Sequence, residues 1–293
     1  MSSFSPSGPL PSPAASATRV FDKNLLQLHR ERAQKNFTPE QGSDFMLRWA
    51  ERELTYRLED IKRRFPQATL LSPSISEEFS DYLTTRCDQL DFKADQALGF
   101  DEILEIEPKS QDLIISLFEL QKINDVTGWL IQSRLALKED GAFIGCCVGG
   151  NSLFQLRQSL LAAEIKVMGG ASPRVAPLMT KQQLGGLLQR AGFALPVVDS
   201  EDVTADYRDI FHLMKDLRAM GESNALTHQQ KQFTPSRLFH EAGVIYQERF
   251  QNSGKKLPAT FEVIFFIGWG PSATQPQPLK PGAAHISLKD LLE

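Results

Sequence analysis

The residues best suited to bind a charged ligand lie in the second half of the chain. Gly149 and Gly150 follow an apolar run, where a double glycine lets the chain turn sharply, and Arg157 sits on the helix expected next. The remaining candidates for substrate or partner binding are Arg174, Arg218, Glu222 and Asn224. If these side chains converge, they form a polar pocket for a carboxylate or a guanidinium group. The alternative is structural pairing, for example of Arg218 with a neighbouring acid.

The cysteines and histidines offer no metal-binding pattern. Cys146 and Cys147 are adjacent within an apolar run, and Cys87 stands alone, so we expect buried thiols rather than disulfides or zinc ligands. None of the five histidines pairs with a cysteine or carboxylate at metal spacing. The sequence therefore predicts no metal site and a reducing compartment.

Composition places the chain among ordinary soluble globular proteins. It has 293 residues, 41% of them apolar, and a net charge of -4, which gives no general signal for nucleic-acid binding. No apolar run approaches the roughly 20 residues that a membrane span needs. Residues 1–18 are uncharged and rich in Ser, Pro and Ala, so we expect a disordered tail without a secretory signal. A single domain is expected over 19–270, with a Pro-rich C-terminal tail at 271–293.

Apolar periodicity predicts alternating strands and helices. Helices are expected at 44–64, 126–137, from 153 with Asn151 or Ser152 as cap, 181–190, 207–220 and 235–252. Strands are expected at 68–71, 112–118, 142–148, 193–199 and 260–269, with a turn at 139–141 and an ambiguous stretch at 79–98. The alternation predicts a mostly parallel sheet covered on both faces. The helical pair within 207–252 is interpreted as an insertion that forms a lid or a substrate wall.

Several segments together carry a family resemblance. They are residues 20–22, 29–33, 137–145, 149–153 with 156–157, 169–175, 188–199, 216–224, 258–263 and 268–269. The chain resembles the methyltransferase-like assembly factors of respiratory complex I and their bacterial counterparts, strongly over 137–270 and poorly over 67–111. The resemblance implies the class I S-adenosylmethionine-dependent methyltransferase fold, a seven-stranded sheet with helices on both faces and one antiparallel strand at 261–269. It also implies chemistry linked to S-adenosylmethionine, associated in this family with hydroxylation of a protein arginine.

Two departures from the family fall on the expected cofactor surface. No glycine occurs between Gly42 and Gly99, and the acidic residue and glycines that relatives carry after the first long helix are replaced within 67–74. The His-Trp pair of relatives is replaced by Gln121-Lys122. Because the apolar strands keep their character, we interpret this as loss or remodelling of cofactor binding.

The cofactor-binding candidates that remain are few. Ser72 and Ser74 offer hydroxyls, although Pro73 removes one backbone donor and the stretch also fits an ordinary turn. Asp91 or Asp95 is the acid that would hold the ribose hydroxyls, and Phe118 is placed beside them at the end of the strand 112–118. The acidic pair at 101–102 matches one in the family, and as surface charge it needs no other explanation.

Three functions remain open at this point. The favoured one is a non-catalytic assembly or partner-binding protein with a degenerate cofactor site, acting on a complex I subunit or another protein. The alternative is an active S-adenosylmethionine-dependent enzyme that modifies a protein arginine or methylates a small or carrier-bound acid. The third is a methyltransferase-fold module with a different small ligand. The expected location is the cytoplasm of a bacterium or the mitochondrial matrix of a eukaryote.

Overall fold

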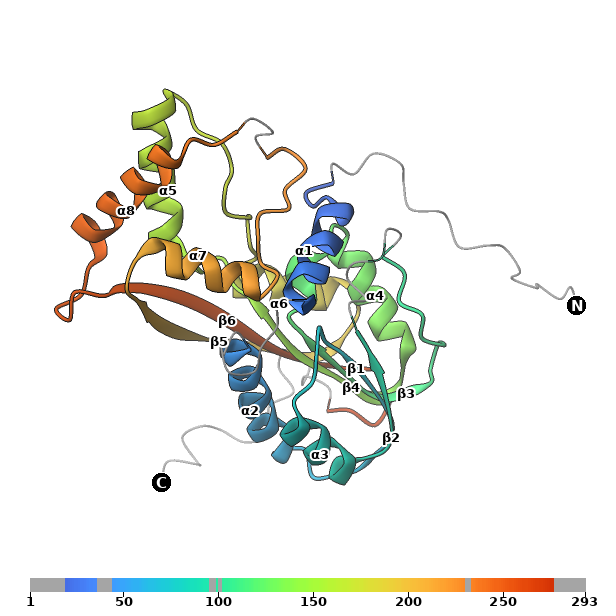
Figure 1. Ribbon diagram of the computed structural model, residues 1–293. Coiled ribbons are helices and arrows are strands. Elements are labelled where there is room, and N and C mark those ends of the chain that lie inside the picture. Colours follow the sequence, from blue (N-terminus) through green and yellow to red (C-terminus); the bar gives the residue numbers. More distant parts are fainter. Residues whose placement is uncertain (1–18, 36–43, 95–98, 100–101, 230–232, 277–293) are drawn as a thin grey trace, which may run out of the picture. The chain divides into compact units, whose positions relative to one another are not determined.

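The computed structural model describes residues 19–35, 44–94, 99, 102–229 and 233–276. Its helices are α1 (Lys23–Lys35), α2 (Phe45–Glu59), α3 (Glu77–Arg86), η3 (Leu120–Lys122), α4 (Val126–Ala136), α5 (Phe154–Met168), α6 (Lys181–Arg190), α7 (Ile210–Ala219) and α8 (Ser236–Phe250). Its strands are β1 (Phe65–Leu71), β2 (Cys87–Lys93), β3 (Gln111–Leu117), β4 (Leu137–Val148), β5 (Ala194–Tyr207) and β6 (Leu257–Trp269) (Figure 1). The predicted tail 1–18 and the end of the predicted tail 271–293 lie outside the described residues.

The chain divides into two compact units. The helical unit comprises 1–43, 153–176 and 206–259, and the sheet unit comprises 44–152, 177–205 and 260–293. The helical unit holds α1, α5, α7 and α8, so the predicted insertion at 207–252 lies within it. Most of the sheet and the helices α2, α3, α4 and α6 belong to the sheet unit.

Parallel pairing dominates the sheet, whose strand order is β2-β1-β3-β4-β6-β5. β1 pairs in parallel with β2 and β3, and β3 pairs in parallel with β4, whereas β6 runs antiparallel to β4. The antiparallel strand expected at 261–269 is therefore confirmed, although β6 begins at Leu257. Among the described residues the sheet has six strands rather than the expected seven. This α/β architecture is of the class I methyltransferase type.

Helices cover both faces of the sheet in the sheet unit (Figure 1). Neighbouring residues of a strand point to opposite faces, as Phe265 and Phe266 show. The Phe265 ring contacts Trp49 of α2, with centroids 5.7 Å apart. Phe266 stacks near Phe143, at 5.1 Å, in the core that also holds Trp129 of α4 and Leu184 of α6. The predicted two-sided coverage is thus confirmed.

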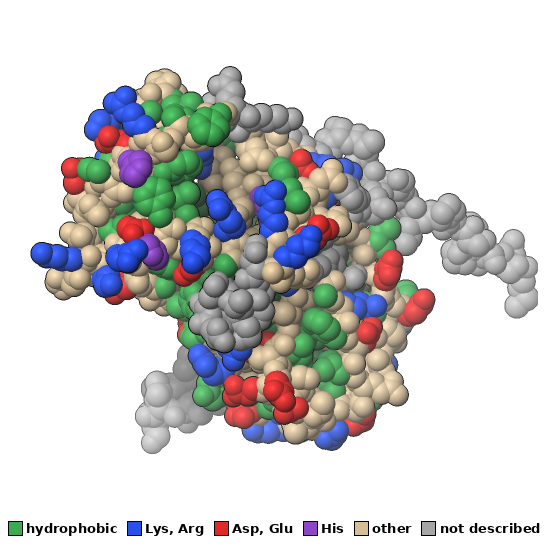
Figure 2. Space-filling view, viewed as in Figure 1, with side chains coloured by type: hydrophobic (Ala, Val, Ile, Leu, Met, Phe, Trp, Pro, Cys, Tyr) green, Lys and Arg blue, Asp and Glu red, His purple; other side chains and the backbone are tan. Residues whose placement is uncertain are grey.

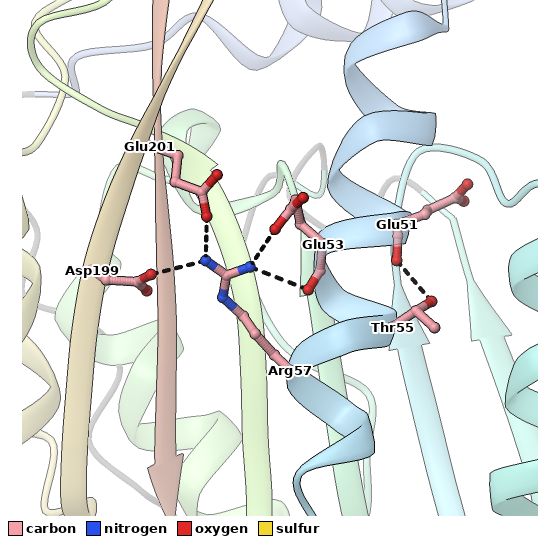
Figure 3. A network of polar contacts seen from close by, with 6 residues as sticks. All are labelled: Glu51, Glu53, Thr55, Arg57, Asp199 and Glu201. Atoms are coloured by element: carbon pink, nitrogen blue, oxygen red, sulfur yellow. Dashed lines mark hydrogen bonds and ion pairs between the residues drawn. The ribbon is translucent and has the colours of Figure 1, made fainter.

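One arginine ties α2 to the far edge strand of the sheet. Arg57 donates to Asp199 at 2.8 Å and to Glu201 at 2.7 Å, both on β5, and to Glu53 on its own helix (Figure 3). Its guanidinium lies 3.8 Å from the centroid of the Phe265 ring. Asp199 and Glu201 lie more than 140 residues from Arg57 along the chain, so no local sequence pattern reveals these two ion pairs.

The turn predicted at 139–141 is wrong. β4 runs through it, and Asp140 takes a left-handed conformation with φ 60°. The register between β3 and β4 shifts at this point, so the chain forms an irregularity within the strand rather than a reversal. The Glu-Asp-Gly residues do bend the chain locally, but β4 pairs with β3 on both sides of them, so the strand continues.

Two smaller boundaries also differ from the prediction. β1 begins at Phe65, because α2 already ends at Glu59 and the chain straightens before Pro66. Neither Asn151 nor Ser152 caps α5: the N-cap is Leu153, at φ 54°, with no side-chain hydrogen bond. The Ser152 hydroxyl instead donates to the Glu262 carbonyl at 3.1 Å, which ties it to β6.

Candidate functional site

The loop after β1 uses its own polar groups. The Ser72 hydroxyl donates to the Ser74 carbonyl at 2.6 Å, and the Ser72 amide donates to the Lys93 carbonyl at 3.3 Å. The Ser72 side chain is fully buried. The first of the two predicted hydroxyls is therefore turned into the loop and already has an acceptor.

A buried carboxylate closes the other end of this loop. Glu51 of α2, only 2% exposed, accepts from the Ser76 amide through Oε1 at 3.0 Å, while the Ser76 hydroxyl caps α3 by accepting from Phe79. Burial raises the pKa of Glu51. Its Oε2 atom is buried and has no hydrogen-bond partner within the part of the chain that the structure describes. Sequence analysis missed Glu51 because helical periodicity does not reveal which polar residue turns inward.

A lysine, not an acid, ends β2. Lys93 lies opposite Leu71 at the last register pair of β1 and β2. Asp91 lies two residues earlier in β2, opposite Thr69. The Lys93 ammonium is 3.3 Å from the Asp91 carboxylate. Ribose hydroxyls need an acceptor to hold them, and an ammonium only donates. The alternative acid, Asp95, lies outside the described residues.

The segment after β3 is buried and unusually polar. Phe118 is 7% exposed, has φ 53°, and its amide donates to the Cys146 carbonyl at 3.0 Å. Glu119, Gln121 and Lys122 are all less than one-tenth exposed. Both amide atoms of Gln121 are buried without a hydrogen-bond partner among the described residues. A buried amide without hydrogen bonds costs free energy. A ligand that formed hydrogen bonds with Gln121 would remove this cost.

Glu102 has a structural role that surface charge does not explain. It is 8% exposed, and its carboxylate accepts from the amides of Asn124 and Asp125, each at 2.8 Å, just before α4. It therefore holds the start of α4, which benefits from a negative charge at its N-terminus. The interpretation of Glu102 as surface charge is wrong, because its carboxylate is buried against the N-terminus of α4. Asp101 lies outside the described residues.

Gly149 and Gly150 are required for space rather than for a special backbone angle. Neither has a positive φ. A Cβ on Gly149 would lie 2.6 Å from the Glu262 carboxylate, which accepts from the Asn151 amide at 2.8 Å. The turn predicted from the double glycine is confirmed: residues 150–153 form a turn, with the Ser152 amide donating to the Gly149 carbonyl at 3.0 Å. The close approach of Glu262 on β6 adds a steric requirement at Gly149.

The other predicted binding residues belong to the helical unit, and two pairs form within it. Arg174 donates to Glu164 at 2.7 Å, and Asn224 donates to the Pro173 carbonyl at 3.1 Å. Glu164 is 2% exposed; burial opposes its ionisation, but hydrogen bonds from Arg174 and Ser172 outweigh burial and lower its pKa. Arg174 therefore has the structural partner that the alternative interpretation anticipated.

Arg218 and Glu222 lie near His29 of α1. Burial lowers the pKa of His29, the Arg32 and Arg218 charges lower it further, and the Glu222 charge opposes them. Arg157 lies in the first turn of α5, where its amide donates to the Leu153 carbonyl at 2.9 Å. The binding role predicted for these residues stays a prediction.

Two further properties concern the described part of the chain. No group of three or more His, Cys, Asp or Glu side chains in that part could hold a metal ion. No helix found there combines the length and apolar character that crossing a membrane requires.

Comparisons with known proteins give relatives along nearly the whole chain. The mitochondrial arginine-hydroxylase NDUFAF5 of Danio rerio is 31% identical over 288 residues, covering 93% of this chain and 89% of the relative. A malonyl-[acyl-carrier protein] O-methyltransferase of Xylella fastidiosa is 32% identical over 170 residues, covering 58% of this chain and 55% of the relative. Among solved structures, the YcgJ protein of Bacillus subtilis is 10% identical and covers 75% of this chain and 98% of its own, with a TM-score of 0.49. No protein-family model matches.

The first of these relatives settles the family. Its similarity covers 93% of this chain, well beyond the length of the segment 137–270 that carried the resemblance most strongly. The chain belongs to the family of the NDUFAF5 arginine-hydroxylases.

Proposed function

We propose that this chain is a non-catalytic member of its family, which binds a protein partner and does not hold S-adenosylmethionine at the end of β1. The partner we propose is a subunit or assembly intermediate of respiratory complex I, inside the compartment where that complex is assembled. The observation that carries the proposal is the loop at 72–76, where the Ser72 hydroxyl, the Ser72 amide and the Ser76 amide all donate hydrogen bonds within the chain. A nucleoside that packs on this loop needs close backbone approach and free donors.

Three contacts support the loss of the cofactor. The Ser72 hydroxyl and amide and the Ser76 amide all have acceptors within the sheet unit. Pro73 has no amide hydrogen to offer. Lys93 ends β2 with a donor where ribose hydroxyls need an acceptor. The residues present therefore do not fit S-adenosylmethionine, and no chemical step is assigned to it.

Exposed apolar side chains of the helical unit support the partner-binding part of the proposal. Phe211 on α7 is 44% exposed, Val244 on α8 is 48% exposed, and Phe233 ahead of α8 is 90% exposed. Exposed aromatic and aliphatic side chains of this kind are characteristic anchors of protein interfaces.

Isothermal titration of the full chain with S-adenosylmethionine and with S-adenosylhomocysteine tests the cofactor part. We expect no heat of binding up to about 1 mM ligand, which corresponds to less than about 4 kcal/mol of binding free energy. A dissociation constant in the micromolar range would contradict the proposal. The malonyl-carrier methyltransferase relative, titrated in parallel, controls for the quality of the ligand.

Complementation tests the partner part. In cells that lack this protein, Lys93→Glu and Glu51→Ala should restore assembled complex I as well as the wild type does. The surface pair Phe211→Asp/Val244→Asp should not restore it. The opposite pattern, with the loop variants inactive and the surface variant active, would show that the loop carries function.

One observation favours the active enzyme as a second candidate. Both amide atoms of Gln121 and the Oε2 atom of Glu51 find no hydrogen-bond partner in the described ranges, and all three atoms are buried. A bound ligand at this end of the sheet would satisfy such atoms. If the chain is an active enzyme, Gln121→Leu should abolish cofactor binding. If it is a non-catalytic partner-binding protein, the same substitution should only stabilise the fold.

A further inference from the structure

The sheet unit contains a pocket that the proposed function does not use. Its volume is about 300 Å³, and it lies on one face of β1 and β2, against the segment 105–111. The lining runs from Lys93 at the end of β2 to Gln111 at the beginning of β3. It therefore follows a face of the sheet rather than the edge where class I cofactors lie.

Hydrogen-bond donors on the floor of this pocket are largely used within the chain. The Thr69 hydroxyl donates to Gln111 Oε1 at 2.9 Å, Gln111 Nε2 donates to Ser110 Oγ at 2.8 Å, and the Ser110 hydroxyl donates to the Glu107 carbonyl at 2.7 Å. Thr69 is 1% exposed and Gln111 is 6% exposed, so this chain of bonds is held in place by burial. The hydroxyl and amide oxygens keep spare lone pairs. The floor thus offers mainly acceptors.

The walls add negative charge to this acceptor-rich floor. They carry Asp91, Glu105 and Glu107 against a single cation, Lys93, which is ion-paired with Asp91 at 3.3 Å. No ion pair is found for the Glu105 and Glu107 carboxylates among the described residues, and both side chains are exposed. Two uncompensated carboxylates therefore border the pocket.

The charge of the whole unit reinforces the charge of the pocket. The sheet unit has 26 acidic and 16 basic residues, whereas the helical unit has 10 acidic and 16 basic residues. Figure 2 shows Asp and Glu side chains gathered over α2 and α3, and Lys and Arg side chains over α1 and α7. The potential around the sheet unit favours the approach of cations.

We infer that this pocket binds an extended organic cation, an ammonium or guanidinium group on a short carbon chain. Glu105 and Glu107 supply the charge, and the oxygens of Thr69, Gln111 and Ser110 accept its hydrogen bonds. Ile106, which also lines the pocket, contacts the carbon chain. Such a group belongs either to a free amine or to a lysine or arginine side chain of another polypeptide. The inference does not depend on whether residues 72–76 accept a cofactor.

Titration of the full chain at low salt tests this inference, with spermidine as the free amine and N-acetyl-arginine amide as the side-chain mimic. We expect at least one of them to bind at concentrations below about 1 mM. Glu105→Gln/Glu107→Gln should weaken that binding about tenfold or more, with an unchanged thermal midpoint because both side chains are exposed. Preference for spermidine identifies a small amine, and preference for the arginine amide identifies a basic side chain.

A matched control separates the pocket from the general charge of the unit. Glu139→Gln/Asp202→Asn removes the same charge from exposed positions of the sheet unit outside the pocket and should change affinity less than about twofold. Lys93→Met should tighten binding, because it removes the competing cation. Equal weakening by both double variants would overturn the inference. So would the absence of binding at about 5 mM, or preferential binding of N-acetyl-glutamate amide.

Discussion

The Glu262 carboxylate occupies the space that a side chain at position 149 would need. The Gly149 amide donates to the Glu262 carbonyl at 2.8 Å, and the Asn151 amide donates to the Glu262 carboxylate, also at 2.8 Å. Glu262 of β6 thereby holds the two residues Gly149 and Asn151 that follow the end of β4. Glycine at position 149 is explained by this contact, independently of any ligand.

Gly149→Ala should therefore destabilise the fold by about 2 kcal/mol, because the new Cβ displaces the Glu262 side chain. Urea unfolding at neutral pH measures the change. Gly186→Ala is the matched control: it lies within α6 with nothing within 4 Å of the added Cβ, so it should stabilise by up to about 1 kcal/mol. If the Gly149→Ala and Glu262→Ala effects were simply additive in the double variant, the steric explanation would be wrong.

Arg57→Ala should destabilise the fold by about 2 kcal/mol. It removes the contact with Phe265 and three carboxylate partners at once, two of them well exposed and screened by solvent. The measurement is the midpoint of thermal unfolding at low and high salt, with part of the difference disappearing at high salt. Arg64→Ala breaks an exposed pair with Asp88 and hydrogen bonds to the Thr85 and Cys87 carbonyls, and should change stability by less than about 1 kcal/mol. Equal effects of the two substitutions would show that the Phe265 contact contributes nothing.

Glu51→Gln should change the pH dependence of stability. Burial raises the pKa of Glu51 above its ordinary value of 4.5, so the folded chain holds this proton more tightly than the unfolded chain does. The contribution of Glu51 to stability is therefore largest at low pH and falls as the pH rises from the unfolded pKa through the folded one. Relative to the wild type, the variant should gain stability as the pH rises above the ordinary pKa of 4.5, measured by urea unfolding. Glu59→Gln, exposed on the same helix, should show no such gain, and a pH-independent difference for Glu51→Gln would refute the assignment.

The three thiols should be unreactive in the folded protein. Cys87, Cys146 and Cys147 are all buried. Burial raises the pKa of Cys87 to about 11 and that of Cys147 to about 12, so little thiolate is present at neutral pH. Ellman's reagent should titrate no thiol in buffer near pH 8 and three in concentrated urea. Rapid reaction of one thiol without denaturant would reveal local opening of its strand.

The strands and helices with strong periodicity were predictable because their signals are local. The helix at 181–190 was predicted to the residue, and the apolar runs of β3, the second half of β4 and β6 were located within a few residues. Local signals failed where a distant partner decided the outcome. Residues 139–141 lie within β4 although their types favour a turn. The hydroxyl of the predicted cap Ser152 accepts a hydrogen bond from the Glu262 amide instead of capping α5.

The sequence by itself determined the class of fold, the family and the absence of glycine after β1, because each depends on residue type and order along the chain. The tertiary structure alone decided which polar groups at that place remain available. Ser72 turns inward, Glu51 reaches across from α2, and Lys93 stands opposite Leu71 at the last register pair of β2. These relationships join residues from separate elements, and hydrogen bonds over such separations depend on packing geometry that no local pattern encodes.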